Sequence, residues 1–380
     1  MKKLISILLT IVTLLSALAV MPTAGAETSS SEKTTYIPKY IAYSNKYGTV
    51  YNDGKRLVAE SAKGEKVTLA KKTSPDDWFG FYMRGKKVIY RAWDSNELYS
   101  VGIDGKNKKK LATDIWVFIG GYGDDVIVYI DDGIYKIDPK GNKTKIFDDE
   151  DIIRDFYLFG GKLYMWNATE YIVYDLNTKK TSTVKMRRVV IGQNHMYYMN
   201  SEKDLIQVNK NGVKRAVARN VGHICAVNNG ATVVYSKPLI IRDKKYKTFY
   251  RKTNGLKTVK LGRAKDIRKK AESIVLNSKK FDIKGGGYYG IKKVTIGRKN
   301  AYFLVKFRYS QSKVAGTMIL PVNLNTGKIG DPVKFYDDDT DGVIVDIGYE
   351  NGYIYYEVAE IAETDSDSEW DYSYTRIKVS

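Results

Sequence analysis

Asp337, Asp339 and Asp341 alternate along the sequence and are followed by Gly342. Carboxylates at alternate positions of a loop converge on one hard cation, and a glycine at the sixth position permits the sharp turn of a calcium loop. At the twelfth position, where such a loop has a bidentate Glu, the chain has Gly348. The sequence therefore leaves two interpretations of this stretch, a calcium site at Asp337, Asp339 and Asp341 or a solvated acidic turn.

A second set of residues that could bind a ligand is a long basic stretch. From Lys237 to Lys313 the chain has 24 Lys and Arg residues and only 4 Asp and Glu residues. Such a positive field attracts polyanions, with a strength that falls as the salt concentration rises. The candidate polyanion contacts are Lys244, Lys245, Lys247, Arg251, Lys252, Arg268, Lys269, Lys270, Lys292 and Lys293.

The charge of the whole chain is unevenly distributed. Its 380 residues include 63 Lys and Arg against 43 Asp and Glu, a net charge of +20. Residues 337–380 have the opposite bias, with 2 basic and 13 acidic residues. The basic stretch is therefore open to two interpretations. In one, it binds an anionic polymer. In the other, its charges only keep the protein soluble or pair with the acidic end of the chain.

The residues that most enzymes use for nucleophilic or metal chemistry are scarce. The two histidines, His195 and His223, lie in apolar strand-like runs, and the one cysteine, Cys225, has no partner for a disulfide. We find no zinc-ligand spacing, no nucleophile elbow and no phosphate-binding glycine loop. We therefore expect a non-catalytic protein without a resident cofactor, calcium aside. The alternatives are a secreted glycan-active enzyme that uses two carboxylates in a central channel, and a structural protein stabilised by calcium.

A repeated unit must position these residues. An apolar run ending in tyrosine, a polar turn, a second β-rich run and an Asp or Asn turn with Gly recur along the chain. The anchor residues are Tyr43, Tyr90, Tyr129, Tyr164, Tyr197 and Tyr235, with gaps of 47, 39, 35, 33 and 38 residues. A period near 40 with about four short strands is typical of propeller blades. We predict an all-β propeller of four-stranded blades, with seven favoured over eight or six and the ring closed by the N- and C-terminal strands.

One segment departs from the β pattern. Between Ala264 and Ser278, the residues Ile267, Ala271 and Ile274 recur at helical spacing. We predict a helix there, inside a basic insertion near residues 264–285 that separates two blades.

The repeat resembles that of exported bacterial propellers related to the YWTD (low-density-lipoprotein-receptor-type) family. The resemblance covers nearly all of the predicted mature chain and rests on the order of its parts: Tyr, an apolar strand with Tyr, Asp or Asn with Gly, and a Lys-rich strand. The YWTD tetrapeptide itself is absent, because the stretches that begin at Tyr90, Tyr129 and Tyr164 read YRAW, YIDD and YMWN. The resemblance implies binding or scaffolding more than catalysis.

The first 26 residues have the pattern of a signal peptide. Lys2 and Lys3 precede an apolar run from Leu4 to Val20, and small residues stand at Ala24 and Ala26. We expect cleavage there, a short linker over residues 27–35, and a single propeller domain over residues 36–380. No later apolar run has the length of a membrane span.

These features together predict the compartment and the partners. A secreted or cell-wall-associated protein without disulfides is typical of a Gram-positive bacterium. The expected partner is an anionic cell-wall polymer, a polysaccharide or another envelope protein, with no specific binding of nucleic acid.

Overall fold

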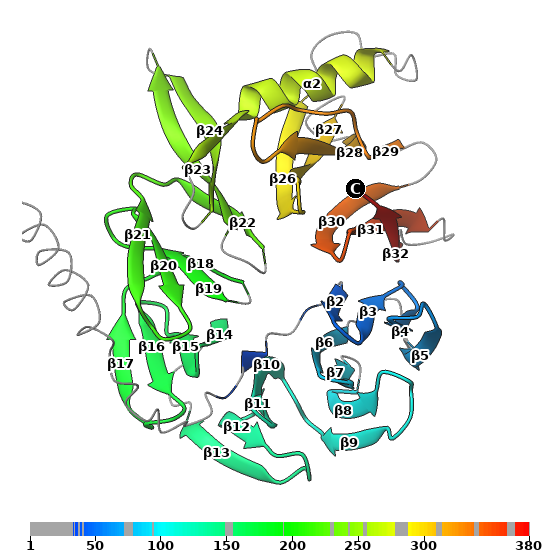
Figure 1. Ribbon diagram of the computed structural model, residues 1–380, viewed down its shortest axis with the longest axis vertical. Helices are drawn as coiled ribbons and strands as arrows, with labels where there is room; N and C mark the ends of the chain where they lie inside the picture. The colour runs from blue at the N-terminus through cyan, green and yellow to red at the C-terminus, as the bar shows by residue number, and fades with distance from the viewer. Residues whose placement is uncertain are drawn as a thin grey trace, which may run out of the picture. The chain divides into compact units, whose positions relative to one another are not determined.

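Eight antiparallel sheets follow one another along the chain (Figure 1). The computed structural model describes residues 33, 35–36, 39, 42–71, 79–92, 95–148, 155–192, 194–228, 232–241, 244–253, 257–277, 288–308, 314–337, 342–362 and 369–379. Thr34–Ser380 form one compact unit. The predicted signal peptide, residues 1–26, lies outside the described residues.

The first four sheets have short strands of similar length. The first contains β2 (Ala42–Asn45), β3 (Gly48–Asn52), β4 (Arg56–Ser61) and β5 (Lys66–Lys71). The second contains β6 (Phe79–Arg84), β7 (Lys87–Ala92), β8 (Glu97–Gly102) and β9 (Lys109–Ala112). The third contains β10 (Val117–Tyr122), β11 (Asp125–Ile130), β12 (Gly133–Ile137) and β13 (Lys143–Asp148), with β1 (Thr35–Tyr36) added beside β10. The fourth contains β14 (Asp155–Phe159), β15 (Lys162–Trp166), β16 (Tyr171–Asp175) and β17 (Thr181–Val184).

The fifth sheet has short strands like the first four, whereas the last three sheets contain the longest described strands. The fifth contains β18 (Arg187–Ile191), β19 (His195–Met199), β20 (Leu205–Asn209) and β21 (Lys214–Ala218). The sixth contains β22 (His223–Val227), β23 (Thr232–Ile241), β24 (Lys244–Thr253) and β25 (Val259–Arg263). The seventh contains β26 (Tyr288–Ile296), β27 (Asn300–Arg308), β28 (Val314–Asn323) and β29 (Lys334–Asp337). The eighth contains β30 (Val343–Glu350), β31 (Tyr353–Ala362) and β32 (Glu369–Lys378).

Side chains of each blade pack against both neighbouring blades. Phe81 and Val88 pack against the first blade, whereas the adjacent Tyr82 and Ile89 pack against the third. This alternation is the two-residue period of a strand with both faces buried. Eight apolar clusters of this kind lie between successive sheets, and the eighth joins the last sheet to the first. The fold is therefore a β-propeller of eight blades, and the prediction that favoured seven is wrong.

The first and last blades meet through side chains. Ala42, Tyr51 and Val58 of the first blade form an apolar cluster with Tyr355 of the last. Within the described residues these two sheets exchange no strand, and the N-terminal strand β1 instead pairs with β10 of the third blade. The described residues therefore do not show the expected closure by N- and C-terminal strands.

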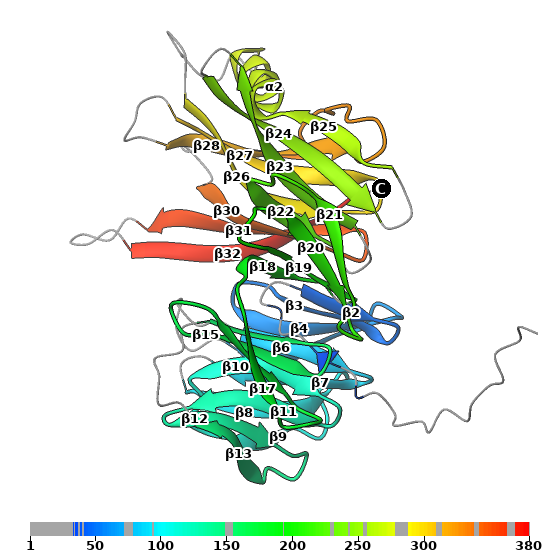
Figure 2. The ribbon, with the colours of Figure 1, turned by 90° about the vertical axis from the view of Figure 1, so that its left-hand side faces the viewer.

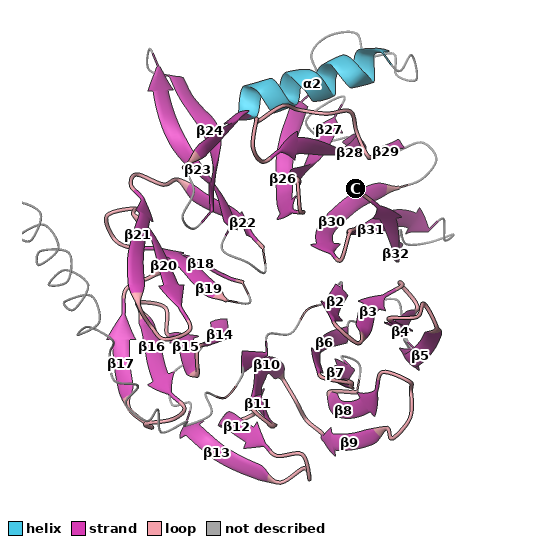
Figure 3. Cartoon of the chain, in the orientation of Figure 1, coloured by secondary structure: helices cyan, strands magenta, loops and turns pink. Residues whose placement is uncertain are grey.

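The predicted helix is present as α2 (Ala264–Asn277), drawn in cyan in Figure 3. Ile267, Ala271 and Val275 are buried, and Ile274 packs against them at the edge of the same cluster. Because these residues face the cluster between the sixth and seventh blades, α2 lies beside β24 and β25, as Figure 2 also shows. No helix in the described residues is long and apolar enough to cross a membrane.

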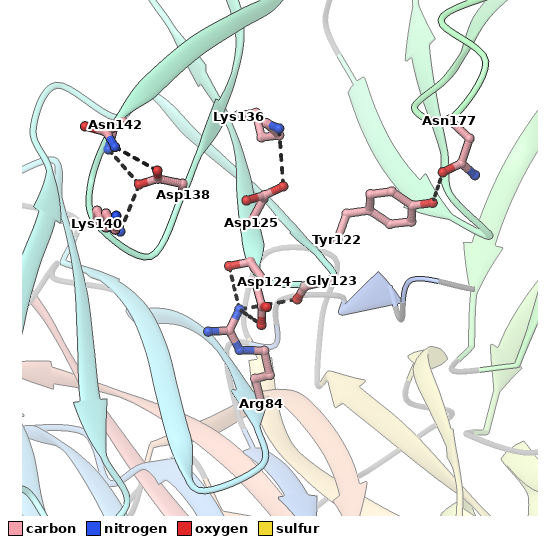
Figure 4. Close-up of polar contacts among 10 residues, drawn as sticks. All are labelled: Arg84, Tyr122, Gly123, Asp124, Asp125, Lys136, Asp138, Lys140, Asn142 and Asn177. Carbon is pink, nitrogen blue, oxygen red and sulfur yellow. Dashed lines mark hydrogen bonds and ion pairs between the residues drawn. The ribbon is translucent and has the colours of Figure 1, made fainter. Parts of the chain in front are cut away.

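The two ends of a blade differ in the connections between strands that they contain. At the crossover end the fourth strand of one blade leads into the first strand of the next. At the opposite end, which we call the turn end, lie the turns from the first strand to the second and from the third to the fourth. The Asp and Asn residues of the sequence repeat form these third-to-fourth turns. Asp138, for example, accepts hydrogen bonds from the backbone of Lys140 and Asn142 at 2.8 and 2.9 Å (Figure 4).

Polar side chains at the turn end tie neighbouring blades together. Arg84 of the second blade donates to the carbonyl oxygens of Gly123 and Asp124 in the third blade, and its guanidinium is 3.2 Å from the Asp124 carboxylate. Tyr122 of the third blade donates to Asn177 Oδ1 of the fourth at 2.6 Å (Figure 4). The polar groups in this view serve contacts within the propeller.

Tyr122→Phe removes the hydroxyl that donates to Asn177 and keeps the buried ring. We expect the free energy of unfolding to fall by about 1 kcal/mol, the usual net contribution of one hydrogen bond. Tyr135→Phe is the matched control, because Tyr135 bonds to Asp132 of its own blade at an exposed turn. Urea denaturation measures both variants, and an equal loss in the two would contradict a special role for the contact between blades.

Candidate functional site

Four exposed cations lie on adjoining elements of the sixth and seventh blades, on or toward their crossover end. Lys247 is in the half of β24 nearest that end, Arg268 and Lys269 are on α2, and Lys292 is in β26. All four side chains are exposed. Since α2 contacts both β24 and β26, three adjoining elements supply them. None of the ion pairs among the described residues involves any of the four. We call these four residues the basic surface.

Other predicted contacts already have partners within the propeller. Lys270 Nζ is 2.9 Å from Asp331 Oδ1, and Lys293 pairs with Asp346 of the eighth blade. The second pair matches the alternative interpretation of the basic stretch, in which its charges pair with the acidic end of the chain. Positive charge in this region is therefore divided between internal pairs and the basic surface.

Arg251, one of the candidate polyanion contacts, is buried, whereas binding to a polymer requires an exposed cation. Its side chain is only 5% exposed, and its guanidinium donates to Leu324 O and Asn325 Oδ1, both at 2.9 Å. Burial lowers its pKa. It lies near the turn end of β24, at the far end of that strand from Lys247. Arg251 therefore joins the sixth blade to the seventh and is not available to a polymer.

Of the three remaining candidates, Lys252 has a described side chain, whereas Lys244 and Lys245 do not. Lys252 is half-buried, so it is a weaker candidate than Lys247. Lys244 and Lys245 lie at the start of β24, opposite Ile241 and Ile240, but their side chains lie outside the described residues.

The predicted calcium loop is largely outside the described residues. The backbone of Asp337 ends β29, where it pairs with Gly316. Asp339 and Asp341 fall in the undescribed segment 338–341. No group of three possible metal ligands occurs among the described residues. The calcium interpretation stays a prediction.

Several carboxylates at the turns are held in the ionised form. Lys145 donates to Asp132 at 2.8 Å and lowers the pKa of that carboxyl group. Lys110 and Tyr99 do the same for Glu97. A glycosidase needs one carboxylic acid with a raised pKa to protonate the leaving group. These two carboxylates do not meet that requirement.

Sequence reasoning missed two groups that lie near the basic surface. His223, interpreted as structural, is exposed at the first position of β22. Arg188, which lies outside the basic stretch, donates from Nη1 to Gly222 O at 2.7 Å, next to His223. The signal that could have found Arg188 is the pair Arg187-Arg188, which opens the first strand of a blade.

The fold and this surface define an eight-bladed β-propeller with a basic crossover end. No protein-family model matches the chain, and no curated protein matches it by sequence.

Solved structures are similar at the level of the chain trace. BamB from Moraxella catarrhalis has 12% identity and a TM-score of 0.42, covering 85% of this chain and 96% of that chain. Hsv2 from Kluyveromyces lactis has 10% identity and a TM-score of 0.39, covering 92% and 100%. The N-terminal domain of Nup159 has 10% identity and a TM-score of 0.35, covering 86% and 88%.

Proposed function

We propose that the protein is an exported binding module that holds an anionic cell-wall polymer on its basic surface. The observation that carries the proposal is the set of four exposed cations, Lys247, Arg268, Lys269 and Lys292, on three adjoining elements without carboxylate partners among the described residues. Several cations on one surface bind a polymer whose charges repeat, and they do so without a deep pocket.

Export and a binding role are supported by the sequence. The pattern of residues 1–26 is that of a signal peptide, which would bring the propeller to the cell envelope. Its resemblance to exported bacterial propellers related to the YWTD family favours binding over catalysis. The anionic polymers of the envelope are then the polyanions that the basic surface meets. In a Gram-positive bacterium these include wall polymers linked by phosphodiesters.

Sedimentation with purified cell walls at rising salt tests the proposal. We expect the protein to pellet with walls at low salt and to be released as salt increases, because counterions compete for the cations. Binding that is absent at low salt, or that does not change with salt, would contradict it. Competition with a soluble polysaccharide lacking charge, with anionic lipid vesicles and with DNA identifies other ligands as separate outcomes.

A charge-reversal pair locates the binding surface. Arg268→Glu with Lys269→Glu is expected to weaken wall binding at least tenfold and to reduce the slope of log affinity against log salt by about 2. Lys179→Glu with Lys180→Glu is the matched control, because it makes the same change in net charge at exposed positions of the turn end. Equal losses in the two variants would show that net charge, rather than the basic surface, governs binding.

A further inference from the structure

A cationic cluster that shares Lys247 with the basic surface spans the first strands of the fifth and sixth blades, β18 and β22, and the third strand of the sixth, β24. In β18, β22, β26 and β30 the pairing with the second strand is interrupted by a shift in register. A bulge of this kind redirects side chains, and bulges concentrate near functional sites. In β18 the shift falls between Arg187 and Val190 and includes Arg188, and in β26 it falls at Lys292.

Arg188 is held in an unfavourable backbone conformation. Its φ is +54°, and it is the one non-glycine residue with positive φ that lies inside a described strand. This conformation costs about 1 kcal/mol for a side chain without a local hydrogen bond to relieve it. The bulge therefore directs the exposed Arg188 guanidinium to a position that regular strand pairing would not give. The hydrogen bond from this guanidinium to Gly222 O fixes the side chain beside the sixth blade.

His223 and Lys247 approach the same point from the sixth blade. His223 pairs with Ser236, which pairs with Phe249 in β24, and Lys247 is two residues before Phe249 on the same face of the sheet. The His223 residue is exposed overall, but partial desolvation of its ring lowers its pKa. The bond to Ile224 O opposes this shift, and the nearby charges of Arg188 and Lys247 add to it. No ion pair in the described part of the chain neutralises Arg188 or Lys247.

The hydrogen bonding of His223 determines when it can bind an anion. Its Nδ1 contacts the carbonyl oxygen of Ile224, so Nδ1 carries the proton in the neutral ring. Nε2 then becomes a donor only when the imidazole is protonated. The other charged or titratable basic groups on the described elements packed against β22 are Arg187 on β18, His195 on β19, Lys237 on β23, and Lys292 and Lys293 on β26, the last paired with Asp346.

We propose that Arg188, His223 and Lys247 form a binding site for a phosphate group. A guanidinium, an ammonium and an imidazolium together provide directed donors and the charge to hold a tetrahedral dianion or a phosphodiester. A bound phosphate also offsets the repulsion among the three cations, which the described residues leave uncompensated. The site deepens the proposed function, on which it rests for the source of the phosphate, a phosphodiester of the wall polymer.

Because phosphate binding and protonation of His223 are linked, binding at this site can be measured without the polymer. In the free protein the pKa of His223 lies below its ordinary value. The folded state therefore loses stability as pH falls from that ordinary value toward the lowered pKa, because the unfolded chain binds the proton first. A phosphate bound beside the ring favours the protonated form, so binding raises the pKa and strengthens as pH decreases.

NMR titration of the two imidazoles, with and without inorganic phosphate, tests the site. The full chain has only His195 and His223, so two resonances report, and His195→Gln assigns them. We expect phosphate to raise the His223 pKa by about 1, a tenfold preference for the protonated ring, and to leave His195 unchanged. Arg188→Gln and Lys247→Gln should each reduce that response severalfold. A His223 pKa that phosphate does not change would overturn the site.

Wall binding separates the two proposals. Loss of binding in Arg268→Glu with Lys269→Glu, but full binding in Arg188→Gln with His223→Gln at pH 5.5, would overturn the phosphate site as the polymer contact and leave the basic surface standing. A normal response of His223 to phosphate in a protein that does not pellet with walls would overturn the proposed function alone. We expect the Arg188 and His223 variant to bind walls severalfold more weakly at pH 5.5, a working value below the ordinary His pKa of about 6.5.

Discussion

Arg376→Ala is expected to lower the free energy of unfolding by about 2–3 kcal/mol and the melting temperature by about 4 °C. Arg376 is in β32 of the last blade, and its guanidinium is 2.6 Å from Glu60 Oε2 of the first blade. It also lies 4.7 Å from the centre of the Tyr51 ring and 4.6 Å from that of Tyr353. A charge-assisted hydrogen bond and cation–π contacts with aromatic rings are lost together in the variant.

We expect a large loss of stability because the Arg376 contact joins the last blade to the first. Among the residues whose side chains are described, the apolar cluster between the last and first blades has four buried members, whereas each of the other seven clusters has at least seven. Since a closed ring keeps its sheet edges covered only while every interface holds, the smallest core depends most on its polar contacts.

Thermal and urea denaturation measure this effect against two comparison variants. Arg376→Lys keeps the charge but loses the planar stacking, so about half of the loss should remain. Arg56→Ala is the control, because Arg56 is half-exposed and pairs with Asp53 of its own blade, and exposed pairs contribute less than about 1 kcal/mol. An Arg376→Ala protein as stable as the Arg56→Ala protein would show that closure does not depend on this residue.

The architecture could be predicted because every blade repeats the same burial. Strands with both faces covered are apolar at nearly every position, and this made the copies visible in the sequence. The error in blade number comes from the first copy of the repeat, which we expected to close the ring with the C-terminal strands, whereas it forms a blade of its own. This copy looked irregular because Tyr43 was taken as its anchor. In the structure Tyr90, Tyr129, Tyr164, Tyr197 and Tyr235 are on the second strands of their blades, whereas Tyr43 is on a first strand. Tyr51 is the second-strand residue, and its distance of 39 residues from Tyr90 fits the period.

The candidate site could be located only coarsely from the sequence. Charge density found the region, but it could not separate Lys247 from Arg251, which are four residues apart and lie in opposite halves of one strand. Lys293 was indistinguishable from Lys292 until the bulge in β26 and the pairing with Asp346 were known. Arg188 and His223 were missed because they become neighbours only through the packing of β18 against β22.

Replacing Arg251 by alanine should separate structural cations from polymer contacts. Arg251→Ala removes a buried side chain and leaves the carbonyl oxygen of Leu324 and the amide oxygen of Asn325 without their donor. The unsatisfied carbonyl oxygen of the buried Leu324 and the space left behind are each destabilising, whereas the exposed Asn325 can bond to water, so we expect the free energy of unfolding to fall by about 3 kcal/mol. Arg251→Met fills most of the space without donating hydrogen bonds and should lose about half as much.

Wall binding by the same variants completes the comparison. At a temperature where they remain folded, Arg251→Ala and Arg251→Met should bind walls with the affinity and salt dependence of the unchanged protein, because the guanidinium is covered by the seventh blade. Arg268→Glu with Lys269→Glu should show the reverse, with weaker wall binding and little change in stability, because both side chains are exposed on α2. A stable Arg251→Ala protein with reduced wall affinity would mean that Arg251 reaches the polymer, and the division between buried and exposed cations on which the basic surface rests would then be wrong.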